Sequence, residues 1–193
     1  MEFQYSSGKL DIIMGCMFSG KTSELLKRID KTKLIYGDNV LIINHKSDKR
    51  YGEESGIYSH NNYFKSSTSC NQLHEVIESD AFKNAKAVFI DEAQFFDDLN
   101  IFVYHCVEKL DKWVTICGLD GDFLRNRFGQ LIDLIPLADS VIKLKALCLR
   151  CGDGTDALFS KRIIKKQTNK NDSVILVGHK SDYESVCRYH YNN

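Results

Sequence analysis

The sequence predicts an α/β fold in which a parallel sheet carries helices on both faces and a small metal-binding lobe follows near the C-terminus. Three observations predict it. Short apolar runs alternate with helical patterns up to residue 145, several of these runs are apolar throughout, and a glycine-rich loop joins the first run to the first helix. Strands without polar alternation are typical of a parallel sheet that is covered on both faces.

The expected strands and helices follow one another in a regular order. Apolar runs such as AVFI predict the strands, and side chains three or four positions apart, such as Leu25, Leu26 and Ile29, predict the helices. We expect strands at residues 9–14, 39–44, 87–90, 114–118 and 140–144. We also expect helices at residues 22–33, 71–84, 99–110 and 127–135, an irregular polar stretch at 46–69, and a further strand at 173–177.

The glycine-rich loop after the first strand is the strongest chemical signal. Residues 15–22 read GCMFSGKT and match the phosphate-binding pattern G-x-x-x-x-G-K-[ST]. In that pattern the glycines let backbone N–H groups face a phosphate, the lysine reaches the β- and γ-phosphates, and the hydroxyl binds Mg²⁺. The helix that follows adds the positive end of its dipole. We therefore expect a sheet like that of P-loop NTPases, and the expected nucleotide-binding residues are Gly15, Cys16, Met17, Phe18, Ser19, Gly20, Lys21 and Thr22.

Two carboxylates end the third expected strand. Asp91 and Glu92 directly follow the run AVFI. An acidic residue at the end of a neighbouring strand completes the Mg²⁺ site in phosphate-loop proteins, so Asp91 and Thr22 are the expected magnesium residues. Successive side chains of an extended segment point in opposite directions, so we expect Glu92 to point away from the metal and to act as a general base.

Three of the seven cysteines are spaced for a metal ion. Cys148 and Cys151 form one C-x-x-[CH] pair, and Cys187 and His190 form a second one after 35 intervening residues. Three thiolates and one imidazole complete the tetrahedral shell of Zn²⁺ and leave no position for a catalytic water. We expect a structural zinc ion. The chain then divides into an α/β nucleotide-binding domain, residues 1–145, and a zinc-binding lobe, residues 146–193.

The composition limits the function. The 193 residues include 26 basic and 26 acidic ones, whereas a domain that holds nucleic acid is expected to be strongly basic. No apolar run approaches the roughly 18–20 residues that span a bilayer, and the first residues lack the pattern of a signal peptide. We expect a cytoplasmic protein that binds neither nucleic acid nor membrane, located in the host cytoplasm if the chain is viral.

Two alternatives stay open on the residues alone. Asp-Glu-Ala-Gln at residues 91–94 is also typical of nucleic-acid helicases, which would make the chain an ATP-driven motor. Such motors need two motor lobes, which exceed the length of this chain. The second alternative is a zinc-ribbon adaptor with a vestigial nucleotide site, which would need zinc to fold and would show no turnover.

The motifs in their order resemble the zinc-containing thymidine kinases of animal cytosol, many bacteria and large DNA viruses. The resemblance covers essentially the whole chain and rests on GCMFSGKT at 15–22, DKRY at 48–51, DEAQFF at 91–96, GLDGDF at 118–123 and the two metal-binding pairs. It implies an ATP- and Mg²⁺-dependent kinase that phosphorylates the 5′-hydroxyl of thymidine, and of deoxyuridine, with Glu92 as the base. The product would enter the salvage route to dTTP for DNA synthesis.

The resemblance also implies roles for single residues. Those expected to position ATP phosphates and Mg²⁺ outside the glycine-rich loop are Asp48, Lys49, Arg50, Asp91 and Gln94. Phe123 and Tyr183 would contact the nucleoside, and Arg162 would lie near the phosphates.

The segment between the two metal-binding pairs would form a lid, or lasso, that zinc closes. Its expected pyrimidine-reading residues are Val174, Ile175, Leu176, Val177 and Gly178. Family members commonly form homotetramers, so the resemblance implies a homo-oligomer.

Overall fold

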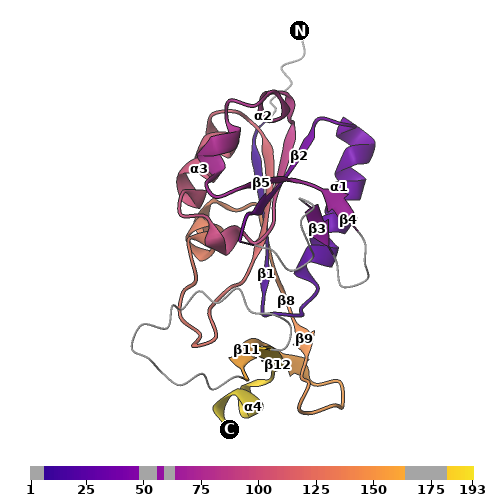
Figure 1. Ribbon diagram of the computed structural model, residues 1–193, viewed down its shortest axis with the longest axis vertical. Helices are drawn as coiled ribbons and strands as arrows, with labels where there is room; N and C mark the ends of the chain where they lie inside the picture. The colour runs from indigo at the N-terminus through magenta and orange to yellow at the C-terminus, as the bar shows by residue number, and fades with distance from the viewer. Residues whose placement is uncertain (1–6, 48–55, 59–63, 164–181) are drawn as a thin grey trace.

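A six-stranded parallel sheet forms the centre of the protein. The computed structural model describes residues 7–47, 56–58, 64–163 and 182–193. The strands lie in the order β5-β2-β6-β7-β1-β8, and every neighbouring pair is parallel. Figure 1 shows the sheet between α1 (Lys21–Tyr36) and α3 (Leu99–Glu108). Their bounds are β1 Lys9–Gly15, β2 Val40–His45, β5 Thr68–Cys70, β6 Ala87–Ile90, β7 Trp113–Gly118 and β8 Ser140–Leu144. The α/β class and all five strands expected for the sheet are confirmed.

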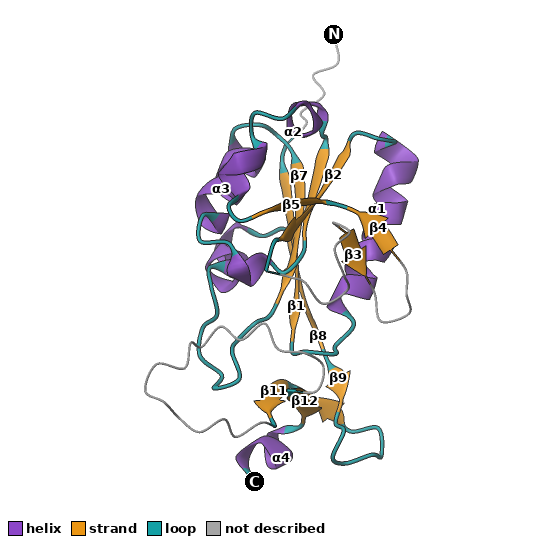
Figure 2. Ribbon diagram, in the orientation of Figure 1, coloured by secondary structure: helices purple, strands orange, loops and turns teal. Residues whose placement is uncertain are grey.

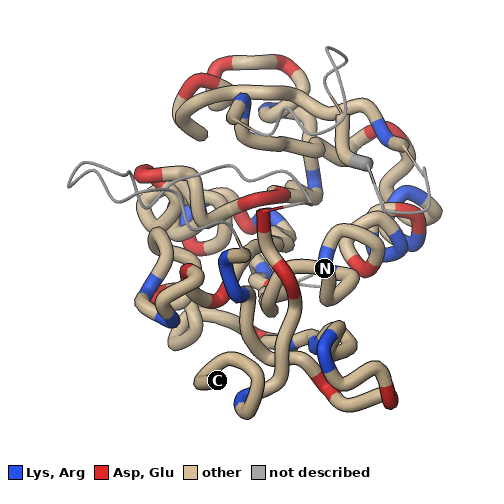
Figure 3. The backbone as a smooth tube through the Cα atoms, turned by 60° about the horizontal axis from the view of Figure 1, so that its bottom comes forward, with Lys and Arg blue, Asp and Glu red and all other residues tan. Residues whose placement is uncertain are grey.

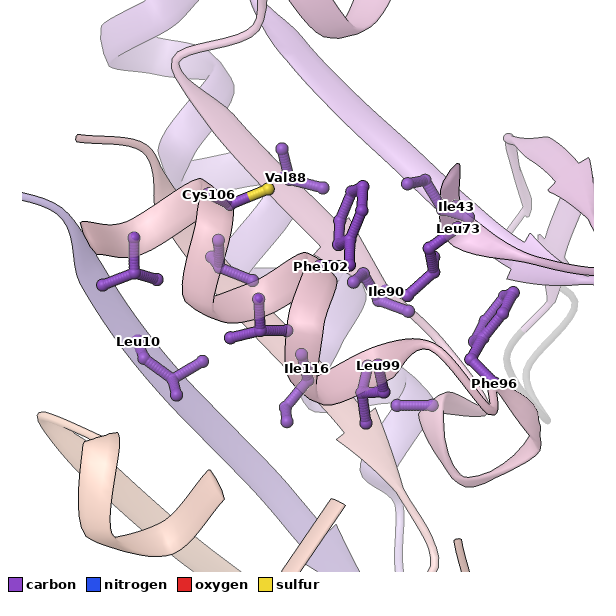
Figure 4. Close-up of a cluster of buried hydrophobic side chains, with 14 of the residues drawn as sticks. Leu10, Ile43, Leu73, Val88, Ile90, Phe96, Leu99, Phe102, Cys106 and Ile116 are labelled. Atoms are coloured by element: carbon purple, nitrogen blue, oxygen red, sulfur yellow. The ribbon is translucent and has the colours of Figure 1, made fainter. Parts of the chain in front are cut away.

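Helices cover both faces of this sheet, as the apolar strands predict (Figure 2). The helix α1 (Lys21–Tyr36) packs Leu25, Leu26 and Ile29 against Phe89 and its neighbours on one face. On the other face, α3 (Leu99–Glu108) packs against the sheet within the larger apolar cluster (Figure 4). The labelled members of that cluster are Leu10, Ile43, Leu73, Val88, Ile90, Phe96, Leu99, Phe102, Cys106 and Ile116.

The polar stretch 46–69 is not irregular where the structure describes it, so that expectation is wrong. The strands β3 (Gly56–Tyr58) and β4 (Phe64–Ser66) form an antiparallel pair, and β5 adds a sixth strand beside β2. These strands bury the apolar side chains of Ile57 and Cys70, and hydroxyl groups add hydrogen bonds. Ser67 and Ser69 donate to Oδ1 of the buried Asn44 at 2.8 and 2.5 Å.

The prediction of a single helix at 71–84 is also wrong, because two short helices begin separately in this segment. The 3-10 helix η1 (Leu73–Val76) begins with a capping box between Gln72 and Glu75. Ser79 then accepts from Phe82 N at 3.2 Å and begins the short helix α2 (Asp80–Asn84). Each cap satisfies the N–H groups of its own first turn, which favours two short helices over one long one.

The helix expected at 127–135 is instead a later 3-10 helix, η3 (Leu131–Leu137). Pro136 lies inside it, and proline lacks the N–H group that a continuing α-helix needs. The expected helices at 22–33 and 99–110 are confirmed as α1 and α3 with shifted bounds.

A small lobe follows β8 beyond the C-terminal edge of the sheet (Figure 1). Its elements are β9 Ala146–Leu147, β10 Asp156–Ala157, β11 Phe159–Arg162, β12 Tyr183–Val186 and α4 Arg188–Asn192. β9 pairs with β10 and β11 pairs with β12, both antiparallel. The strand expected at 173–177 lies outside the described residues. Within the described part of the chain, no helix has both the length and the hydropathy that crossing a bilayer requires.

A buried lysine joins α2 to the sheet. The ammonium group of Lys112 donates to Phe82 O at 3.0 Å and to Ala85 O at 2.5 Å, and it lies 4.9 Å from the centre of the Phe82 ring. Burial lowers the pKa of this ammonium group. It supplies donors to carbonyl groups at the end of α2 that would otherwise have fewer partners.

We predict that Lys112→Ala lowers the free energy of unfolding by roughly 2 kcal/mol, because two carbonyl groups lose a charged donor. Lys83→Ala is the matched control, since Lys83 lies in α2 with its side chain 54% exposed, and such surface changes cost less than about 0.5 kcal/mol. Urea unfolding followed by circular dichroism measures both. Equal losses in the two variants would contradict the role of Lys112.

Candidate active site

The glycine-rich loop leaves the C-terminal end of β1 and enters α1 with a curled backbone. Gly15 has φ 153°, and a Cβ atom there would collide with the Leu144 carbonyl group at the end of β8. Phe18 and Gly20 adopt left-handed conformations with φ 63° and 82°. Lys21 Nζ donates to Cys16 O at 2.9 Å across the loop. Such changes of backbone handedness turn successive N–H groups toward one side and create an anion-binding concavity.

Two further features of this loop fit a phosphate group. Gly20 precedes α1, so no side chain caps the first turn of that helix, and its N–H groups are left for a ligand. Ser19 Oγ is buried, and it has no hydrogen-bond partner among the described residues. Phosphate oxygens are acceptors that would satisfy both sets of donors. The residues present therefore fit the nucleotide phosphates that the sequence pattern predicts.

The two carboxylates follow β6 and are both buried. Asp91 N donates to Ile43 O at 2.9 Å and so continues the ladder with β2. Glu92 does not continue it, because its φ and ψ are 51° and 41°. The argument that Glu92 diverges from Asp91 by strand alternation is therefore wrong. The left-handed turn at Glu92 separates the two residues, and Glu92 N donates to Asp91 Oδ1 at 3.0 Å. A strained non-glycine residue of this kind is typical of functional sites.

Gln94 holds the carboxylate of Glu92 in place. Gln94 Nε2 donates to Glu92 Oε2 at 2.6 Å, and Gln94 Oε1 accepts from Leu119 N at 3.0 Å. The side chain is 3% exposed, so both bonds are shielded from water. Gln94 therefore ties the 3-10 turn η2 (Ala93–Phe95) to the loop that follows β7.

The ends of β1, β6 and β7 meet at one edge of the sheet, because β7 lies between the other two in parallel register. Cys117 lies near the end of β7, at this edge of the sheet. Its thiol is fully buried and interacts with Asp91, Lys21 and Glu92. Burial, together with the two carboxylates, raises its pKa well above the ordinary value. The phosphate-loop lysine and both carboxylates therefore lie at the same edge of the sheet, since β1 and β6 end on either side of β7.

The loop after β7 is shaped by Asp122. Its Oδ1 accepts from Leu124 N at 2.9 Å and from Asn126 N at 2.7 Å. This turn carries Phe123, whose ring centre lies 6.4 Å from that of Tyr183 on β12. The structure therefore brings together the two residues expected to contact the nucleoside, although they are 60 positions apart in the chain.

A second aromatic pair lies beside the same loop and was missed as part of the site. The rings of Phe95 and Phe128 meet edge to face with centres 5.5 Å apart. Phe95 directly follows Gln94, and Phe128 lies in the loop that carries Phe123. Phe95 belongs to the motif DEAQFF and Phe128 directly precedes Gly129, but neither position alone predicts a contact between the two rings.

The four expected metal ligands come together in the small lobe. The ligand atoms of Cys148, Cys151, Cys187 and His190 all lie within 4.8 Å of one another. The three sulfur atoms are 3.6, 3.3 and 3.5 Å from His190 Nδ1, and the sulfurs of Cys151 and Cys187 are 3.8 Å apart. A tetrahedral zinc ion with ordinary bond lengths gives edges of about 3.8 Å between sulfurs and about 3.6 Å between sulfur and nitrogen. The residues therefore fit Zn²⁺.

The pKa values of two thiols in this cluster are shifted in opposite directions. Burial opposes ionisation of Cys148, but the backbone N–H groups of Cys187 and Cys151 outweigh it and lower the pKa of the thiol to about 6. Burial and the neighbouring sulfurs raise the pKa of Cys151 to about 11. The thiolate is the form that binds metal, and a divalent cation would remove the repulsion that opposes the second ionisation.

The strand β11 connects this cluster to the rest of the site through three consecutive residues. Ser160 Oγ accepts from Met17 N in the glycine-rich loop at 2.9 Å. Lys161 Nζ donates to His190 O at 2.6 Å. The guanidinium of Arg162 lies 5.5 Å from the centre of the Phe123 ring, so in this structure it faces the loop after β7. Ser160 was not expected to be a site residue, because a single serine carries no distinctive sequence signal.

Several expected site residues lie outside the described part of the chain. They are Asp48, Lys49 and Arg50 on the phosphate side and Val174, Ile175, Leu176, Val177 and Gly178 in the expected lid.

Comparisons with known proteins agree with this site. The family model for thymidine kinase matches residues 8–191. A thymidine kinase of rice is 39% identical over 99% of this chain and 69% of its own length. Thymidine kinases of fowlpox virus and of Bacteroides thetaiotaomicron are each 38% identical over 95% of this chain, and cover 96% and 87% of their own lengths. The resemblance expected from the motifs is confirmed, and the chain belongs to the thymidine kinase family.

Proposed function

We propose that this protein transfers the γ-phosphoryl group of ATP to the 5′-hydroxyl of thymidine, and of deoxyuridine, with Mg²⁺ bound beside the phosphates. One observation carries the proposal. In a member of the thymidine kinase family, the glycine-rich loop and the strained Glu92 share one edge of the sheet. Phosphoryl transfer depends mostly on positioning and on charge stabilisation, and this edge supplies both.

The phosphate side of the site is assigned to the loop of residues 15–22 and to the residues Asp48, Lys49 and Arg50. Lys21 supplies positive charge to the β- and γ-phosphates. Thr22 and Asp91 would hold Mg²⁺, which neutralises charge on the phosphates when bound. The buried position of Asp91 at the end of β6 supports this role. Gln94 serves the nucleotide side by holding Glu92 and Leu119 in position.

Glu92 is the proposed general base. Its carboxylate accepts the proton of the nucleoside 5′-hydroxyl as that oxygen forms a bond to the γ-phosphorus. The bond from the γ-phosphorus to the β,γ-bridging oxygen breaks, and ADP leaves with the electron pair. The hydrogen bond from Gln94 Nε2 to Glu92 Oε2 supports this role, because it fixes the orientation of the carboxylate.

The nucleoside side is assigned to Phe123, Tyr183 and the backbone of residues 174–178. The ring contact between Phe123 and Tyr183 supports the first two assignments. Backbone groups that read a pyrimidine leave buried donors or acceptors unpaired when the wrong base enters, which costs on the order of 1–3 kcal/mol each. We further propose that residues 1–145 form the nucleotide-binding domain and residues 146–193 the zinc-binding lobe, and that the enzyme is a homotetramer in the cytoplasm.

The motor and adaptor alternatives have less support. Basic and acidic positions are interspersed along the described chain (Figure 3), and the formal net charge is zero. A strand-binding motor would need a basic channel. The adaptor alternative does not account for the strained, buried Glu92, because backbone strain of this kind clusters at active sites and ligand-binding sites.

The function is tested with a panel of natural nucleosides, ATP and Mg²⁺. Thymidine and deoxyuridine should be converted to their monophosphates. No conversion of thymidine under conditions in which the protein binds ATP would refute the proposed reaction. ATP hydrolysis that single-stranded DNA stimulates in the absence of nucleoside would favour the motor.

Glu92→Gln is predicted to lower kcat by about 10² to 10⁴ while ATP still binds, because the amide keeps the shape of the side chain and cannot accept the proton. Glu78→Gln is the control, since its side chain is 88% exposed. Single-turnover phosphorylation and nucleotide titration measure the two properties. A near-normal rate in Glu92→Gln would show that another group is the base.

Zinc removal is predicted to abolish nucleoside binding while part of the ATP affinity remains. The four ligands hold β9 to α4, whereas the glycine-rich loop is built on the central sheet. Elemental analysis should find one zinc per chain, and chelation should raise the KM for thymidine more than that for ATP. Freshly purified, active protein without zinc would contradict the assignment of the cluster.

A further inference from the structure

A helix of the small lobe contacts the loop that carries Phe123. The helix α4 follows Cys187 directly and contains His190, so two of the four cluster residues lie in or beside it. Tyr191 is the next residue after His190. Its hydroxyl donates to Phe123 O at 2.8 Å, across 68 positions of sequence.

Two side chains pack against the ring of Tyr191. The guanidinium of Arg125 lies 4.2 Å from the centre of this ring, and the ring of Phe159 on β11 lies 5.3 Å away. Arg125 also donates to Asn192 Oδ1 at 3.5 Å. A tyrosine packed in this way has little freedom to rotate, so its hydroxyl is presented to Phe123 O in a fixed direction.

The partner loop is shaped to receive this contact. Arg125 has φ 66°, a conformation that a long side chain adopts only where its surroundings hold it. Arg125 N donates to Asp122 O at 3.0 Å, and Asp122 N donates to Asn126 O at 3.0 Å. Residues 122–126 thus form a turn that its own backbone hydrogen bonds hold together. The contact with α4 fixes the position of this turn relative to the small lobe.

We propose that Tyr191 is a positioning residue for the nucleoside site. Its hydrogen bond to Phe123 O fixes the position of the Phe123 backbone, and so of the Phe123 ring, relative to the Cys3His cluster. The cluster then acts on nucleoside affinity through α4. This inference rests on the proposed function, in which Phe123 contacts the nucleoside.

The test compares Tyr191→Phe with Tyr189→Phe. Both remove one hydroxyl from α4, and Tyr189 is 68% exposed. Loss of one neutral hydrogen bond changes an equilibrium by about threefold to tenfold. Tyr191→Phe should raise the KM for thymidine by that factor and leave the KM for ATP, kcat and the zinc content within about twofold. Tyr189→Phe should change none of them.

Phe123→Leu separates failure of this inference from failure of the proposed function. If Phe123→Leu raises the KM for thymidine and Tyr191→Phe does not, the positioning role is wrong and the nucleoside contact stands. If Tyr191→Phe raises both KM values together, or lowers the zinc content, Tyr191 is only a structural residue of the lobe. If Phe123→Leu leaves the KM for thymidine unchanged, the nucleoside contact itself fails, and the positioning role fails with it.

Discussion

The parallel pairing of β1 with β7 and of β7 with β6 is the constraint on which the site depends. Parallel strands end at the same edge, so the loop after Gly15, the carboxylates after Ile90 and the turn after Gly118 meet although about 100 residues separate the first from the last. All four residues of β6 are buried, as are the last five of β7, so helices on both faces fix the register. Burial of the apolar strands therefore brings these three segments to one edge, before any side-chain contact orients the groups they carry.

The sequence predicts well the parts of the molecule that local patterns determine. Strands such as β6 are continuous apolar runs, and α1 shows a helical period after a phosphate-loop pattern. Both can therefore be predicted from the local sequence. β5 could not be read in this way. It is three residues long, and its neighbourhood is held by Ser67 and Ser69 bonding to Asn44 more than 20 positions away. Side-chain hydrogen bonds between distant segments have no period. The break inside 71–84 has a local origin, because Ser79 accepts from Phe82 N three positions later and so begins a new helix.

Glu92 shows the corresponding limit for the site. Its place after an apolar strand was enough to select it as a candidate base, but the argument from strand alternation failed. The left-handed conformation is unfavourable for an isolated glutamate, so no local propensity predicts it. It is stabilised here by Asp91 Oδ1 on one side and by Gln94 on the other, and Gln94 in turn bonds to Leu119 N. The orientation of the carboxylate is thus a property of three segments that fold together.

The β11–β12 ladder closes the small lobe by pairing Arg162 with Tyr183. A metal ion bound by the four clustered residues would add a second closure, between Cys151 and Cys187. In a chain-entropy model, shortening a free loop from about 35 to about 20 residues lowers its closure cost by only about 0.5 kcal/mol. The β11–β12 ladder therefore contributes little to the closure entropy, and its main effect is to fix the register of β11 against β12. Because side chains alternate along a strand, Ser160 and Arg162 reach the glycine-rich loop and Phe123, while Lys161 between them reaches α4. A one-residue slip of β11 would break all three contacts at once, so the lobe can hold the glycine-rich loop and the loop that carries Phe123 in a fixed relation only while this register is kept.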